Sequence, residues 1–161
     1  MRATKLILSA VIAGAGVFFG IIPDCDGAVC RGCGLLSGMD QLQAEIPIIR
    51  IAAERNGIKF GSDEWYLLLA IRKSENGGPG KEFGVTHPRA WGTDLDTQAG
   101  WAAATITKSR FRWRVAGRPS EFIYFLADRY CPKECDRVGH INWKKNVKYW
   151  FERLKNGNDT I

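Results

Sequence analysis

Between residues 41 and 157 the apolar side chains recur at helical spacing, and no stretch alternates regularly between apolar and polar residues. This pattern is typical of amphipathic helices and argues against half-buried strands. Capping residues, prolines and glycines mark the helix ends. They predict five helices: 47–56, 62–75, one opened by Asp94 or Asp96, one opened by Pro119 and Ser120, and one from Asn142 to about Gly157. We therefore expect one all-α domain over 41–157, with room for a short β-hairpin in the 76–92 loop.

The first 22 residues form a segment of a different kind. Arg2 and Lys5 are followed by an uncharged run from Leu6 to Ile22 that is rich in Gly and Ala. A charged start before an apolar core is typical of an export signal, and the run falls just short of the length that spans a bilayer. The segment is predicted to be a signal peptide or a retained signal-anchor, with a buried helix of a cytosolic protein as the alternative. We expect an exported protein, either periplasmic or anchored to the inner membrane and facing the periplasm.

Residues 23–40 are rich in Gly and Cys, lack a sustained period and are predicted to be a linker. The chain has five cysteines, three near the start and two near the end: Cys25, Cys30, Cys33, Cys131 and Cys135. In an oxidising compartment they would form disulfides and leave one thiol over. The alternative is a zinc site made of Cys30, Cys33, Cys131 and Cys135. Because export argues against lasting free thiolates, we expect disulfides, no bound metal and no cofactor.

The chain of 161 residues carries a net charge of +6, which favours polyanionic partners such as nucleic acid, anionic lipid or anionic cell-wall polymer. The segment Arg110–Arg114 alternates cations with aromatic rings, a pattern also found in proteins that bind single-stranded nucleic acid. It equally suits a helix end whose Phe111 and Trp113 pack while the arginines stay solvated. Since an exported protein seldom meets nucleic acid, wall polymer is the expected partner.

Glu75 is the strongest candidate for a catalytic group. It lies four residues after Ile71 and seven after Leu68, so it projects from the apolar stripe of its helix. A carboxyl group buried at the negative end of a helix dipole should have a raised pKa. Such a pKa suits a general acid that protonates a glycosidic oxygen. The alternative is a glutamate at a helix end that is solvated or paired with Arg72.

The segment Leu68–Gly77 (LLAIRKSENG) resembles the first motif of soluble lytic transglycosylases and goose-type lysozymes. In that family a helix of the form A-I-x-x-x-E-S-G ends in the catalytic glutamate, and Asn76 stands where the family has Ser. Phe83–His87 is similar to the G-L-M-Q strip that lines the saccharide groove of the family. Asp96–Trp101 is similar to the stretch that opens the next helix. The resemblance as a whole covers roughly residues 62–130.

The resemblance implies a lysozyme-like fold that cleaves the glycan strands of peptidoglycan, with Glu75 as general acid and base. It also implies a group of substrate-binding residues: Asn76, Gly84, Val85, Thr86, His87 and Tyr130. His87 replaces a glutamine of the family's strip, and Tyr124 or Tyr130 would supply the aromatic hydroxyl of a third motif.

Two mechanisms remain open for such an enzyme. A hydrolase needs a second carboxylate opposite Glu75, for which the candidates are Glu82, Asp94 and Asp96. The resembled transglycosylases use one glutamate, and the sugar's own 6-hydroxyl closes an anhydro ring.

The small size and the apolar N-terminus also suit a phage lysis enzyme. The alternative functions are a non-catalytic glycan-binding or structural wall module of the same fold, and a basic nucleic-acid-binding protein.

Overall fold

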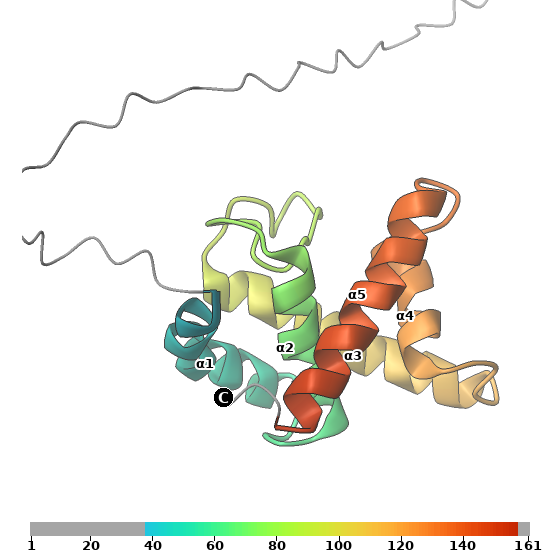
Figure 1. Cartoon of the computed structure of the whole chain (residues 1–161), viewed down its shortest axis with the longest axis horizontal. Coiled ribbons are helices and arrows are strands. Elements are labelled where there is room, and N and C mark those ends of the chain that lie inside the picture. Colours follow the sequence, from blue (N-terminus) through green and yellow to red (C-terminus); the bar gives the residue numbers. More distant parts are fainter. Residues whose placement is uncertain (1–37, 158–161) are drawn as a thin grey trace, which may run out of the picture. The chain divides into compact units, whose positions relative to one another are not determined.

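The computed structural model describes residues 38–157, with side chains from residue 41 onward, and these residues form five helices and no strand (Figure 1). The helices are α1 (Gly38–Arg55), α2 (Asp63–Glu75), α3 (Leu95–Val115), α4 (Phe122–Tyr130) and α5 (Arg137–Lys155). The all-α prediction is therefore confirmed for this part of the chain. Segment 1–22 and all but the end of the 23–40 linker lie outside the described residues. No helix within 38–157 is both long and apolar enough to cross a membrane.

α2 lies at the centre of this helical domain. Its residues from Leu67 to Arg72 are all buried, because α5 packs along it and α3 contacts it as well. α1 packs against α3, while α4 contacts both α3 and α5, so the other helices enclose the same core. Burial of apolar surface is the main favourable contribution to the stability of such a domain. Glu75 ends this buried helix, where the core meets the 76–92 loop at the top of Figure 1.

Capping interactions mark both ends of α2, and its predicted span of 62–75 is confirmed. The hydroxyl of Ser62 accepts a hydrogen bond from the N–H of Trp65, which makes Ser62 the N-cap. At the other end Asn76 adopts a left-handed conformation with a φ of 42° and donates its N–H to the carbonyl of Arg72.

α1 begins earlier than predicted. Residues 38–40 of the predicted linker are helical, and Pro47, expected at the first helical position, lies inside the helix. A proline inside a helix removes one backbone hydrogen bond. Packing offsets this loss, because Leu42 and Ile49 on either side of the proline are almost fully buried. Tertiary contacts therefore extend α1 toward the N-terminus, beyond the start that Pro47 predicts from the local sequence.

Two other helix starts differ from the prediction. α5 begins at Arg137 instead of Asn142, because Asp136 caps it by accepting a 2.8 Å hydrogen bond from the N–H of Gly139. Pro119 and Ser120 were expected to open α4 but lie in the loop before it. The indole N–H of Trp113 donates to the carbonyl of Ser120 at 2.7 Å and holds that residue outside the helix.

The hairpin for which the sequence left room does not form in the 76–92 loop. Most of its backbone hydrogen bonds join residues three apart, such as the bond from Gly84 N–H to the carbonyl of Lys81, which is the pattern of successive turns. Gly80, Gly84 and Gly92 have positive φ, a conformation that bends the chain. A single bond of 3.0 Å, from Gly92 N–H to the Gly80 carbonyl, joins the two sides of the loop.

Candidate active site

The carboxyl group of Glu75 is partly buried at the end of α2 and is bound from α5. The indole N–H of Trp143 donates a hydrogen bond of 2.8 Å to Oε1 of Glu75. Burial raises the pKa of Glu75 above the ordinary value of a glutamate, and the bond from Trp143 lowers it by a smaller amount. Glu75 therefore holds its proton to higher pH than an exposed glutamate does.

Arg72, one turn before Glu75, does not pair with it. Its Nε and Nη2 bind the two carboxylate oxygens of Glu45, each at 2.7 Å, in a bidentate pair that joins α2 to α1. Its Nη1 lies 3.5 Å from the carbonyl oxygen of Glu82, in the loop after α2. Arg72 is therefore paired with Glu45, and the alternative in which it pairs with Glu75 is wrong.

Gly84 lies directly against the carboxyl group of Glu75. A Cβ atom at this position would overlap both Cδ and Oε2 of Glu75. The φ of Gly84 is 62°, which also favours glycine over other residues. The close approach of backbone and carboxyl group therefore requires a glycine here.

A pocket of about 290 Å³ lies next to this contact. It is lined by four consecutive loop residues and by residues of α3 and α4: Gly84, Val85, Thr86, His87, Trp101, Thr105, Arg129 and Tyr130. The ring of His87 stacks on that of Trp101, with centroids 4.5 Å apart and planes inclined by 23°. Gly84 both lines the pocket and touches Glu75, so this glycine lies between the carboxyl group and the pocket, and Glu75 is not itself a lining residue.

Five of the six predicted substrate-binding residues line this pocket, and Asn76 does not. Asn76 ends α2 and lies instead at a small hollow with Gln41 and Glu45. The exposed position of Asn76 follows from its left-handed conformation, which turns the chain away from the axis of α2.

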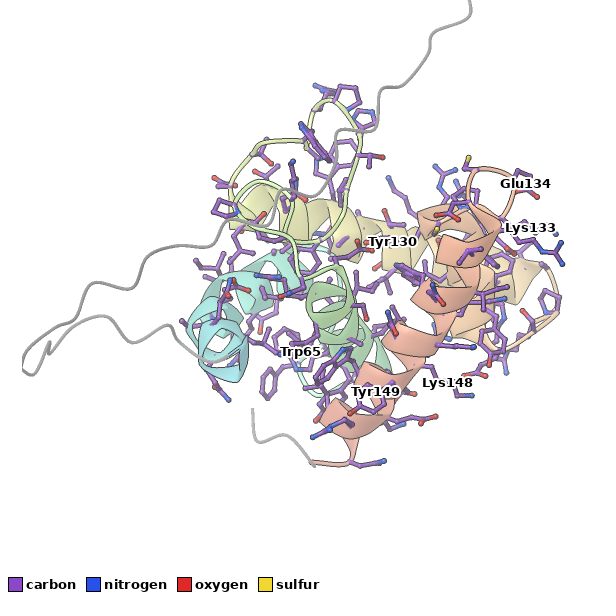
Figure 2. All side chains as sticks on the ribbon, turned by 45° about the horizontal axis from the view of Figure 1, so that its top comes forward. Trp65, Tyr130, Lys133, Glu134, Lys148 and Tyr149 are labelled. Carbon is purple, nitrogen blue, oxygen red and sulfur yellow. The ribbon has the colours of Figure 1, made fainter. Side chains whose placement is uncertain are left out.

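Tyr130, the last residue of α4, is the tyrosine that reaches the site. Its ring stacks on Trp143, with centroids 5.2 Å apart, and its buried hydroxyl has no hydrogen-bond partner. Burial raises the pKa of this hydroxyl, and the charge of Glu75 raises it further. Figure 2 labels Tyr130 at the end of α4, the helix that contacts both α3 and α5. Tyr124 is 40% exposed, with Lys144 and Lys148 over its ring.

The three candidates for a second acid have other partners. Glu82 is buried, and its Oε1 accepts a 3.0 Å hydrogen bond from the N–H of Gly80, while its Oε2 has no partner. Asp94 caps α3, and the hydrogen bond from the N–H of Thr97 lowers its pKa. Asp96 pairs with Arg55 of α1. Glu82 is the only one of the three that lies in the loop beside Gly84.

The remaining sequence candidates lie elsewhere. Cys131 and Cys135 are not bridged to each other, and Cys25, Cys30 and Cys33 lie outside the described residues, so the disulfides and the alternative zinc site stay predictions. No group of three or more metal-binding side chains occurs within 41–157. Arg110 pairs with Glu64 at 2.9 Å and covers the ring of Phe122.

Sequence reasoning did not assign Trp143, Trp101 and Arg129 to the site. Trp143 and Trp101 lie on helices that the spacing of apolar residues predicts, and this spacing cannot distinguish a core ring from a ring that faces a carboxyl group. Arg129 precedes Tyr130 on α4, and nothing in the pattern marks it.

Replacing Gly84 by Ala is expected to displace the carboxyl group of Glu75. Gly92→Ala is the matched control, because Gly92 lies in the same loop with a φ of 75° and has open space around an added Cβ. Both variants should lose about 1 kcal/mol to backbone strain. Gly84→Ala should lose more stability than that, and it should lose at least about tenfold of any activity that depends on the position of Glu75. Urea unfolding of both variants measures the difference, and equal losses would contradict the contact.

Comparison of the chain with protein-family models, with curated proteins and with solved structures finds no match.

Proposed function

We propose that this protein cleaves the glycan strands of peptidoglycan, with Glu75 as the general acid. The observation that carries the proposal is a partly buried glutamate with a raised pKa in contact with Gly84, which lines a pocket that also contains aromatic rings. Glycosidases need such an acid, since the leaving oxygen must be protonated while the enzyme works near neutral pH. The resemblance of Leu68–Gly77 to the glutamate motif of lytic transglycosylases supports the same assignment.

In the proposed reaction a glycan strand lies across the pocket, with one sugar ring against the stacked rings of His87 and Trp101. Glu75 donates its proton to the glycosidic oxygen as the bond to the sugar carbon breaks. In the transglycosylase mechanism the resulting carboxylate then takes the proton of the sugar's own 6-hydroxyl, which closes an anhydro ring. In a hydrolase a second carboxylate acts on the other face of the sugar.

The proposal includes the place of action. A signal peptide or anchor over residues 1–22 would bring the domain to the periplasmic side of the inner membrane, where the wall is accessible. The chain would act there as a wall-degrading or phage lysis enzyme without a metal or cofactor.

Incubation of the purified full-length protein with bacterial cell walls tests the proposal. We expect loss of turbidity and release of muropeptides, and mass analysis of the fragments distinguishes anhydro from reducing ends. Binding to walls without release would favour a glycan-binding module of the same fold. Steeply salt-dependent binding to DNA, with no effect on walls, would favour a nucleic-acid-binding protein.

The two mechanisms differ in whether a second carboxylate is needed opposite Glu75. If Glu75 acts alone, we expect Glu82→Gln, Asp94→Asn and Asp96→Asn each to keep most of the wall lysis. Asp94→Asn should lose stability of at most about 1 kcal/mol, since it alters a helix cap, so lysis must be normalised to folded protein. A collapse of activity in Glu82→Gln alone, with an unchanged melting temperature, would contradict the single-acid mechanism and indicate a hydrolase.

A further inference from the structure

We infer that Trp143 is a positioning residue: its indole N–H holds Oε1 of Glu75, so that the transferable proton is carried by Oε2, beside Gly84 and the pocket. The inference rests on the proposed function of Glu75. It adds Trp143, which lies 68 positions after Glu75 in the chain, to the proposed active site. It also assigns different roles to the two carboxyl oxygens of Glu75.

The two oxygens of Glu75 differ because an indole nitrogen can only donate a hydrogen bond. Trp143 lies 2.8 Å from Oε1, so Oε1 is the acceptor whether the carboxyl group is charged or neutral. The proton of the neutral acid therefore belongs on Oε2. That oxygen lies against Gly84, the residue through which Glu75 adjoins the pocket, because a Cβ atom on Gly84 would overlap it.

Packing from two helices fixes the direction of the indole. Trp143 is 8% exposed and stacks on Tyr130 of α4 with the ring planes inclined by 22°. One turn before it, the ring of His140 lies 2.6 Å from the carbonyl oxygen of Cys131, and one turn after it Val147 is fully buried. A donor held by so many contacts needs no reordering when charge develops on the carboxyl group.

Two titratable groups on the α4 side respond to the charge of Glu75. The pKa values of Tyr130 and Cys131 are raised, mainly by burial and in part by the charge of Glu75. Both groups therefore stay neutral over the range in which Glu75 titrates. Of the two cations in the last turn of α2, Arg72 is paired with Glu45, and Lys73 has its Nζ over the ring of Trp150. The hydrogen bond from Trp143 is thus the contact within 41–157 that acts to lower the pKa of Glu75.

Trp143→Phe in the full-length protein tests this role, because it keeps an aromatic ring against Tyr130 and removes the donor. Loss of a hydrogen bond to a charged group should raise the pKa of Glu75, so the alkaline limb of the pH profile of wall lysis should move up by about one pH unit. The kcat at the optimum should fall about tenfold, with KM little changed, since the carboxyl group is no longer held in place. Trp113→Phe is the matched control, because it loses an indole bond to a backbone carbonyl away from the acid. It should leave the profile unchanged.

Titration of the Glu75 carboxyl by carbon NMR gives a second readout that does not need activity. Its pKa should rise in Trp143→Phe and stay constant in Trp113→Phe. In the wild-type protein the indole N–H resonance of Trp143 should shift with pH at the same midpoint, and the shift should vanish in Glu75→Gln. The pH response of this indole resonance tests whether Trp143 binds Glu75 even if Trp143→Phe does not fold.

The inference is overturned if Trp143→Phe behaves like Trp113→Phe in both titration and pH profile, or if the indole resonance does not respond to pH. If the wild-type protein lyses no walls, the proposed function fails, while the titrations still decide whether Trp143 holds Oε1. The two failures are therefore distinguishable.

Discussion

Glu75→Gln is expected to abolish wall lysis, with a loss of about 10²–10⁴ in kcat. Glutamine has nearly the same shape as glutamate, and its oxygen can still accept the bond from Trp143, so the fold should be preserved. The proton that we propose on Oε2 is lost, and the glutamine amide cannot take over its transfer. Turbidity assays with equal amounts of folded protein measure the effect. A variant that keeps most of the wild-type activity would exclude Glu75 as the acid.

The same substitution should also change how stability depends on pH. Burial raises the pKa of Glu75 in the folded state above its unfolded value. The neutral carboxyl group therefore favours folding below the unfolded pKa, and this contribution is lost as pH rises through the folded pKa. Glutamine has no such dependence. As the pH rises from the unfolded pKa of Glu75 through its higher folded pKa, the melting temperature of the wild-type protein should fall relative to that of Glu75→Gln.

Glu54→Gln is the matched control for both measurements. Glu54 is exposed on α1 and pairs with Arg50 along the same helix. Its substitution should leave wall lysis and the pH dependence of stability unchanged. An identical pH dependence in wild-type protein and Glu75→Gln would contradict the burial of the acid.

Glu45→Ala is expected to have the largest effect on stability, lowering the free energy of unfolding by about 3 kcal/mol. The side chains of Arg72 and Glu45 are only 5% and 13% exposed. Removing Glu45 leaves the guanidinium of Arg72 buried without its partner, which costs more than the pair itself contributes. Arg72 also approaches the Glu82 carbonyl, so the loop that contains Gly84 should loosen as well. Urea unfolding and hydrogen exchange of the loop amides measure both effects.

The control for this prediction is Glu54→Ala, on the same helix. Its ion pair is about half exposed, so its loss should cost at most about 0.5 kcal/mol. Replacing the buried pair together, as Glu45→Leu with Arg72→Met, should recover much of the lost stability, since no unpaired charge remains. If Glu45→Ala and Glu54→Ala cost the same, the pair does not join α1 to α2 energetically.

The parts of the fold that local sequence determines could be predicted. Ser62 caps α2 and Glu75 ends it, because capping and the apolar stripe depend on residues within one or two turns. The strip from Gly84 to His87 was expected to line a groove, and it does line the pocket beside Glu75.

The parts that depend on distant residues could not be predicted. The partners of Glu75 and Arg72 lie 68 and 27 residues away, and no local pattern relates Trp143 to Glu75 or Glu45 to Arg72. Pro47 marks a helix start by its local preference, yet the burial of Leu42 and Ile49 extends α1 past it. Tertiary packing overrides local propensity at these positions.

Because the hydrogen bond between Trp143 and Glu75 joins α5 to α2, Glu75 depends on a helix that the ribosome synthesises later. The ribosome completes α2 long before it completes α5, and contacts between such distant segments form late in folding. A nascent chain that still lacks α5 contains Glu75 without the indole that orients it and without the helix that buries it. The proposed acid would therefore be oriented only once α5 has docked, and a chain truncated before Trp143 would lack this hydrogen bond to Glu75.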